Sequence, residues 1–115
     1  MGSEFDSLAE RDMLKQAGIE QALVHAEDVS PQWRNKAFHA LTEYLKEYPQ
    51  GHLFQVEDFR KWALLNEKIQ DPPSARAYGG IIVRAANQSL IRRDGFASTK
   101  SKTAHGAVAA QWRKI

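Results

Sequence analysis

The chain has 115 residues, a length typical of one domain with a modest hydrophobic core. It contains no cysteine, which excludes disulfides and thiolate chemistry, and no apolar run long enough to span a bilayer, so we expect a cytoplasmic protein. The net charge of +2 hides an asymmetry: residues 76–115 carry eight Lys or Arg and one acid, a net +7, and the preceding residues carry −5.

Residues 1–5, MGSEF, look like a cloning-vector remnant and do not enter the fold prediction. Residues 6–29 are predicted to form an N-terminal helical extension. The Ser7–Glu10 stretch is a capping-box pattern that begins a helix, which we expect to break near Gly18. A second short helix then carries an apolar stripe of Ile19, Ala22, Leu23 and Ala26. We expect this stripe to pack on the protein's own core, with homodimerisation as the alternative.

Residues 30–115 are the main predicted domain. Its first helix begins at Ser30-Pro31, with the serine as N-cap and the proline in the first turn. The apolar stripe of this helix contains Trp33, Ala37, Leu41, Tyr44 and Tyr48, widened by Phe38, Ala40 and Leu45. Pro49 and Gly51 end the helix. This spacing is typical of a helix packed in a core rather than of an aromatic ligand site.

A short strand is expected at residues 52–55, followed by a helix that ends near Asn66. Its buried face is predicted to contain Phe59, Trp62 and Ala63. Gln55 stands where this helix needs an N-cap, and glutamine is a poor cap. Asp71-Pro72-Pro73 prevents any continuation of the helix, because proline disfavours the helical conformation in the residue before it.

The next helix is predicted to run from Ser74 to about Ser89. Its core face contains Ser74, Tyr78, Ile81, Ile82, Ala85 and Ser89, and its opposite flank contains Arg76, Gly80, Val83, Arg84 and Asn87. Each glycine of Gly79-Gly80 costs about 1 kcal/mol relative to alanine in a helix, so something is expected to approach the backbone closely there. A neighbouring helix would approach Gly79. At Gly80 a nucleic-acid backbone and a tight internal helix crossing are equal alternatives.

Two strands are predicted near the end of the chain, Leu90–Ala97 and Ala107–Arg113. In the second strand Val108, Ala110 and Trp112 alternate inward. The connection between the strands is polar, small and positive, and it is too long for a tight hairpin turn. We therefore expect it to be the tip of a mobile wing.

The order helix, short strand, helix, helix, strand, basic loop, strand resembles winged helix-turn-helix domains, which predicts an α+β, mostly helical fold. Several stretches also resemble small, mostly uncharacterised proteins of bacteriophages and prophages. The matching stretches are Lys15–Ala22, Val56–Ala63, Asp71–Gly79, Arg84–Ala86, Leu90–Arg92, His105-Gly106 and Trp112-Arg113. The resemblance implies a phage accessory protein that acts in the cytoplasm of a bacterial host, and it supplies no established activity.

The sequence contains no pattern typical of catalysis or metal binding. The four histidines are scattered and none belongs to a zinc-binding pattern, so no metal or other cofactor is expected. No nucleophile elbow, phosphate-binding loop or dinucleotide fingerprint occurs. The acids lie almost entirely outside the basic region, so the carboxylate cluster of a metal-dependent nuclease is missing. We therefore expect no enzymatic activity.

The basic region predicts a polyanionic partner, and the expected helix and wing point to duplex DNA. Arg76, near the helix start, is the candidate base contact, because arginine can read guanine in the major groove. The other expected DNA-facing residues are Ser74, Gly80, Val83, Arg84 and Asn87 on the helix, and Arg92, Thr99, Lys100, Ser101, Lys102 and His105 in the wing region. Arg93 alternates with Arg92 and is expected to point elsewhere. The alternative for the basic region is a solvated surface without a ligand. The alternative for His105 is an exposed loop histidine without a role.

The rival class is a protein-docking module, because winged helices also serve as docking domains. In that case the acidic N-terminal half, or the Ile19/Leu23 stripe, would hold a replication or transcription protein of the host or the phage. Control of replication or transcription is the expected process in both cases.

Overall fold

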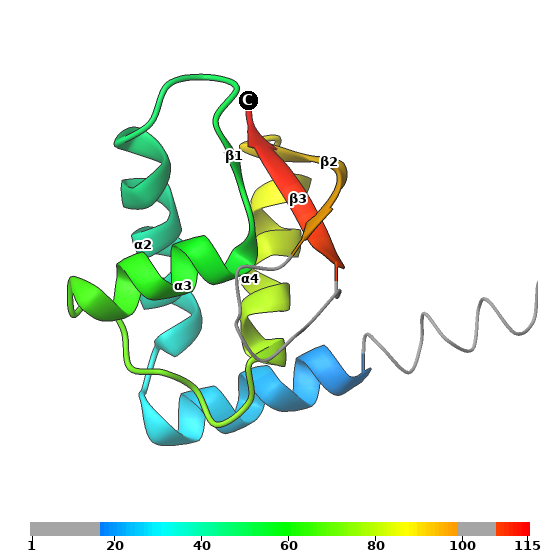
Figure 1. Ribbon diagram of the computed structural model, residues 1–115. Helices are drawn as coiled ribbons and strands as arrows, with labels where there is room; N and C mark the ends of the chain where they lie inside the picture. The colour runs from blue at the N-terminus through cyan, green and yellow to red at the C-terminus, as the bar shows by residue number, and fades with distance from the viewer. Residues whose placement is uncertain (1–16, 99–107) are drawn as a thin grey trace, which may run out of the picture.

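The computed structural model describes residues 17–98 and 108–115. The fold is α+β, about 54% helical, with a small three-stranded antiparallel sheet (Figure 1). Its elements are helix 17–29, α2 (Trp33–Lys46), β1 (Leu53–Phe54), α3 (Val56–Leu65), α4 (Arg76–Asn87), β2 (Ile91–Ser98) and β3 (Val108–Lys114). The α+β class and the order of helices and strands are those predicted from the sequence.

Helix 17–29 packs on the rest of the protein through the predicted stripe. Ile19, Ala22, Leu23 and Ala26 are buried, and they belong to the same core cluster as the residues of α2, α3 and α4. In Figure 1 this helix runs along the bottom of the molecule, close to the beginning of α4. Gly18 is itself helical, so the expected break does not fall at that residue. The Ser7–Glu10 capping box lies outside the described residues.

The start of α2 differs from the prediction. The helix begins at Trp33, after Gln32 in the left-handed conformation with φ of 63°. The Trp33 N–H donates a hydrogen bond to the Glu27 carboxylate at 2.7 Å. Ser30 is therefore not the N-cap residue, although its carbonyl accepts from the same Trp33 N–H at 3.0 Å, and Glu27 of the preceding helix supplies the second acceptor.

Together with the stripe of helix 17–29, residues of α2, α3, α4 and the base of the sheet form the core. Its buried helical residues are Trp33, Ala37, Ala40, Leu41, Tyr44 and Leu45 of α2, Phe59 and Ala63 of α3, and Ala77, Tyr78, Ile81, Ile82 and Ala85 of α4. The Trp33 Nε1–H donates to the Gln70 carbonyl at 2.8 Å, and its ring meets the Tyr78 ring edge-on. These contacts hold α2 against the segment that leads into α4. The prediction that Ser89 lies on the core face of α4 is wrong, because Ser89 follows the end of the helix with a positive φ and is exposed.

The sheet has the strand order β1-β3-β2. β2 and β3 form a two-stranded ribbon, and β1 pairs only with the end of β3, where Phe54 lies opposite Trp112. Trp112 packs against the core as predicted, but Val108 is 64% exposed. The burial of β3 does not alternate: Val108 is exposed and every residue from Ala109 to Lys114 is half-buried, so the predicted inward position of Val108 is wrong.

Two side chains fasten the ends of the ribbon to the helices. The Lys114 ammonium donates to the Leu45 carbonyl at 2.6 Å and the Tyr48 carbonyl at 2.7 Å, at the C-terminal end of α2. The buried Gln55 amide donates to the Ala97 and Ser98 carbonyls of β2, at 3.0 and 3.2 Å. Gln55 also forms a capping box with Asp58 at the start of α3, so the expectation of a poor N-cap at this position is wrong.

Candidate nucleic-acid interface

The two glycines of α4 lie where helix 17–29 crosses it. A Cβ atom on Gly79 would lie 3.5 Å from Ile19 Cδ1, an ordinary contact. A Cβ atom on Gly80 would lie 2.7 Å from Leu23 Cδ1 and 3.2 Å from Ile19 Cγ2, closer than packed carbon atoms approach. The close approach at Gly80 is therefore made by the protein's own helix. This corrects the assignment of Gly80 to a nucleic-acid backbone, because Leu23 occupies that position.

The second half of the predicted flank remains on the surface. Val83 is 41% exposed, and Arg84 and Asn87 are also exposed. Together with Gly80 and Gln88 of α4, and Ile19, Glu20 and Leu23 of helix 17–29, they line a shallow groove of about 280 Å³, here called the α4 groove. The structure thus brings three predicted contact residues together, with the Glu20 carboxylate on the opposite wall.

Arg84, which lines this groove, also contacts α2. Its guanidinium lies 4.0 Å from the centre of the Phe38 ring, and Nη1 donates to Asn35 Oδ1 at 3.4 Å. A cation over an aromatic face is held electrostatically while it stays exposed. Arg84 is therefore oriented by α2 and still presents its charge to solvent.

Arg76 and Ser74 lie apart from the α4 groove. Arg76 is exposed, and its Nη1 atom is 3.1 Å from the position that a Cβ atom on Gly18 would take, so its side chain reaches helix 17–29. The Ser74 hydroxyl accepts a hydrogen bond from the Arg76 N–H at 3.3 Å. Ser74 thus serves the start of α4. The structure does not place Arg76 beside Val83 and Asn87.

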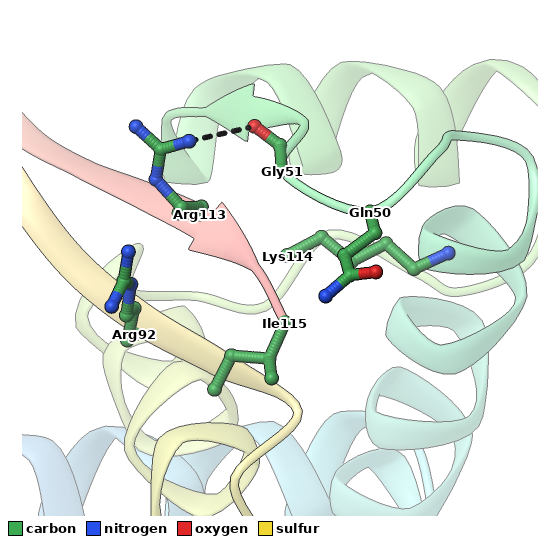
Figure 2. Close-up of a pocket in the computed structure, with 6 residues that line it drawn as sticks. All are labelled: Gln50, Gly51, Arg92, Arg113, Lys114 and Ile115. Atoms are coloured by element: carbon green, nitrogen blue, oxygen red, sulfur yellow. Dashed lines mark hydrogen bonds between the residues drawn. The ribbon is translucent and has the colours of Figure 1, made fainter.

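A cluster of basic side chains lies on the ribbon formed by β2 and β3. Arg92 of β2 and Arg113 of β3 are direct neighbours across the antiparallel pair. They line a hollow of about 410 Å³ together with Gln50, Gly51, Lys114 and Ile115 (Figure 2). Like charges directly opposite each other destabilise a strand pair, so a compensating anion is expected here.

Asp94 compensates only one of these two arginines. Its carboxylate accepts from Arg113 Nε at 2.6 Å and lies 2.5 Å from Nη2, and Arg113 Nη1 points to the Gly51 carbonyl at 3.5 Å. Arg92 is exposed beside this ion pair. Arg113 was not among the predicted contact residues, because its place opposite Arg92 depends on the strand register. The other wing residues in the prediction, Thr99, Lys100, Ser101, Lys102 and His105, lie outside the described part of the chain.

The pKa changes concentrate in the link between α3 and α4. Arg60 pairs with the Asp71 carboxylate through Nη2 at 2.6 Å and Nε at 3.2 Å, and the Tyr78 hydroxyl donates to the same carboxylate at 2.8 Å. The hydrogen bonds from Arg60 lower the pKa of Asp71 below its ordinary value. Burial, and then the bond to Asp71, raise the pKa of Tyr78. This cluster joins α3 to α4 and lies outside both the α4 groove and the hollow lined by Arg92 and Arg113.

Among residues 17–98 and 108–115, no three side chains of the metal-binding types are grouped closely enough to hold an ion. None of the helices in these residues has the length and apolar character needed to cross a bilayer. Comparison with protein-family models, curated proteins and solved structures found no match.

Proposed function

We propose that this protein is a non-enzymatic winged-helix domain that binds duplex DNA. The observation that carries the proposal is the arrangement of α2, β1, α3, α4, β2 and β3 with sheet order β1-β3-β2. This arrangement puts a long helix directly before a basic two-stranded ribbon. A helix that enters the major groove beside a ribbon that contacts the backbone is a recurrent geometry of DNA-binding domains.

The contacts in this proposal are divided between the α4 groove and the ribbon. Asn87 and Val83 of α4 face the bases, where an amide can read adenine and an aliphatic side chain can meet a thymine methyl. Arg84 and Arg92 contact phosphates, and Arg113 helps Arg92 to do so. The loop residues Thr99, Lys100, Ser101, Lys102 and His105 extend the phosphate contacts. Gly80 and Ser74 are left out, because their neighbours within the protein account for them.

The test is a fluorescence-anisotropy titration on a short random-sequence duplex at several salt concentrations. If about six cations contact phosphates, the affinity falls roughly a thousandfold between about 50 and 200 mM salt. The variant Arg84→Gln/Arg92→Gln removes two of them, so its log–log salt slope is expected to fall by about 2. The matched control is Lys61→Gln, which removes an exposed charge on α3 and is expected to alter binding little.

The outcomes separate the proposal from its rival. Salt-steep binding that weakens in Arg84→Gln/Arg92→Gln and not in Lys61→Gln supports DNA binding. If DNA affinity falls equally in both variants, binding depends on the net charge of the protein and not on Arg84 and Arg92. No binding at low salt removes the proposal.

A protein-docking module is the second candidate, and one observation favours it. Helix 17–29 packs over Gly80, while Val83 of α4 is 41% exposed and lines the α4 groove. In this alternative a partner helix or strand covers Val83 in the groove. The process served, in either case control of replication or transcription in a phage, rests on the sequence resemblance.

A further inference from the structure

The far end of the ribbon carries an aromatic side chain without a core to cover it. Phe96 of β2 is 63% exposed and pairs with Ala110, and Val108 of β3 is 64% exposed and pairs with Ser98. Residues paired across an antiparallel ladder lie on the same face, so these four side chains share one face. The same face buries Ile91 near the base of the ribbon, and Phe96 and Val108 extend its apolar surface toward the other end.

A bulge in β2 places Phe96 on this face. Arg93 pairs with Trp112 and Phe96 with Ala110, so Asp94 and Gly95 together stand opposite one residue of β3. In a regular strand Phe96 would lie on the face opposite Arg93, because successive side chains alternate. The extra residue returns Phe96 to the face of Arg93. Gly95 has a φ of 70°, which glycine adopts without strain, and bulges of this kind re-aim a side chain.

Arg93 and Phe96 then form one unit. The Arg93 guanidinium lies 4.7 Å from the centre of the Phe96 ring, and both side chains are exposed. An aromatic ring combined with a guanidinium is the pairing on which nucleobases stack in single-strand-binding proteins. Arg92 and Arg113 pair with each other and lie on the opposite face of the ribbon, so Arg93 supplies the positive charge beside Phe96.

We propose that Phe96 and Arg93 form a stacking platform for an unpaired nucleobase. The preferred ligand is then DNA that offers an accessible base, at a duplex end, an overhang or a bulge, rather than uninterrupted duplex. This proposal rests on the proposed DNA-binding function and specifies which class of DNA is bound. A base on Phe96 covers apolar surface beside the Arg93 guanidinium.

The test compares a hairpin duplex with the same hairpin carrying a single-stranded overhang, with 2-aminopurine as the first unpaired base. Stacking of one base predicts roughly tenfold tighter binding of the overhang and quenching of its fluorescence. Phe96→Ala should abolish both effects. Phe96→Trp should keep them, since it retains an aromatic face, and Phe96→Leu should lose the quenching. Leu65→Ala, which shortens an exposed side chain at the end of α3, is the matched control.

Several results would overturn the platform. Equal affinity for the two hairpins, or an overhang preference that survives Phe96→Ala, rules out stacking on Phe96. If the hairpin duplex binds with a steep salt dependence under either result, the proposed function stands and only the platform fails. If neither hairpin binds, the proposed function itself fails. A native mass that changes from dimer to monomer in Phe96→Ala would make this face an interface between two copies instead.

Discussion

Gly79 and Gly80 are adjacent in α4 but have different neighbours. Both carry the same intrinsic cost in a helix, so the sequence suggested only that something approaches the pair. The structure separates them: Gly79 has room for a methyl group beside Ile19, whereas Gly80 lies directly under Leu23 and Ile19. Gly80 is therefore the position where the helix crossing requires glycine.

Substitution by alanine should distinguish these two positions. Gly79→Ala is expected to stabilise the protein by about 0.5–1 kcal/mol, because alanine has the better helix propensity. In Gly80→Ala the new methyl group meets Leu23 and Ile19, and overpacking of a core costs about 1–3 kcal/mol, so the net effect is loss of stability. Urea unfolding of both variants measures the difference. Equal shifts would mean that the crossing is looser than the structure indicates.

Asp71 should add a pH dependence to stability. Its pKa is lowered in the folded protein by the hydrogen bonds from Arg60, so its contribution is complete above the unfolded pKa of about 4 and is lost as the pH falls through the lower folded value. Both partners are about 40% exposed, so the pair contributes less than about 1 kcal/mol.

The variant Asp71→Asn tests the direction of this pH dependence of stability. It should be less stable than the parent protein near neutral pH, and the gap should narrow as the pH falls below about 4 and through the lower folded pKa of Asp71. Chemical denaturation across this range gives the two curves. Glu57→Gln, at an exposed i,i+4 pair with Lys61, serves as the control. A gap that stays constant with pH would contradict the assignment.

At the scale of the elements, α3 and the ribbon are joined through one buried side chain. Gln55 precedes α3, and its own N–H donates to the Asp58 carboxylate at 2.9 Å. Its side-chain amide supplies donors to two carbonyls at the end of β2. The orientation of the ribbon relative to the helices therefore depends on a hydrogen-bond donor at this position.

Gln55→Glu keeps the shape of this side chain and removes the donor. A carboxylate would then face two carbonyl oxygens in a buried site, and an unsatisfied buried group of this kind costs about 1–3 kcal/mol, more when charged. Protonation restores a donor, so the loss should shrink at acidic pH. Thermal unfolding at two pH values measures it, with the exposed Gln21→Glu as the control. A variant as stable as the parent at neutral pH would show that the amide is dispensable.

At the scale of the whole molecule, the basic third of the chain does not remain a single free cationic surface. Lys114 binds the end of α2, Arg113 pairs with Asp94, and Arg84 lies over Phe38. Arg76 reaches helix 17–29. Part of the charge seen in the sequence is thus used inside the fold, which narrows the proposed DNA contacts to the end of the α4 flank and the ribbon.

Helix 17–29 belongs to the core, so its removal should destabilise the whole molecule. Burial of each large aliphatic side chain contributes about 1.5–3 kcal/mol, and this helix buries Ile19 and Leu23. A chain that starts at residue 30 should therefore lose about 3 kcal/mol or more. Calorimetry against a control that lacks only residues 1–5 measures the change. An unchanged melting temperature would show that the helix is a separate attachment.

The sequence by itself determined the helices, the strands and most of the buried faces of this protein, because the periodicity of apolar residues is a local property. It also indicated the basic region and the close approach at the two glycines. Only the tertiary structure decided which element approaches Gly80, which acceptor caps α2, and which arginines stand opposite each other. Those outcomes depend on helix crossings and strand register, which bring together residues that are distant in the chain. The bulge at Asp94-Gly95 illustrates the difference, since one extra residue in β2 decides on which face Phe96 lies.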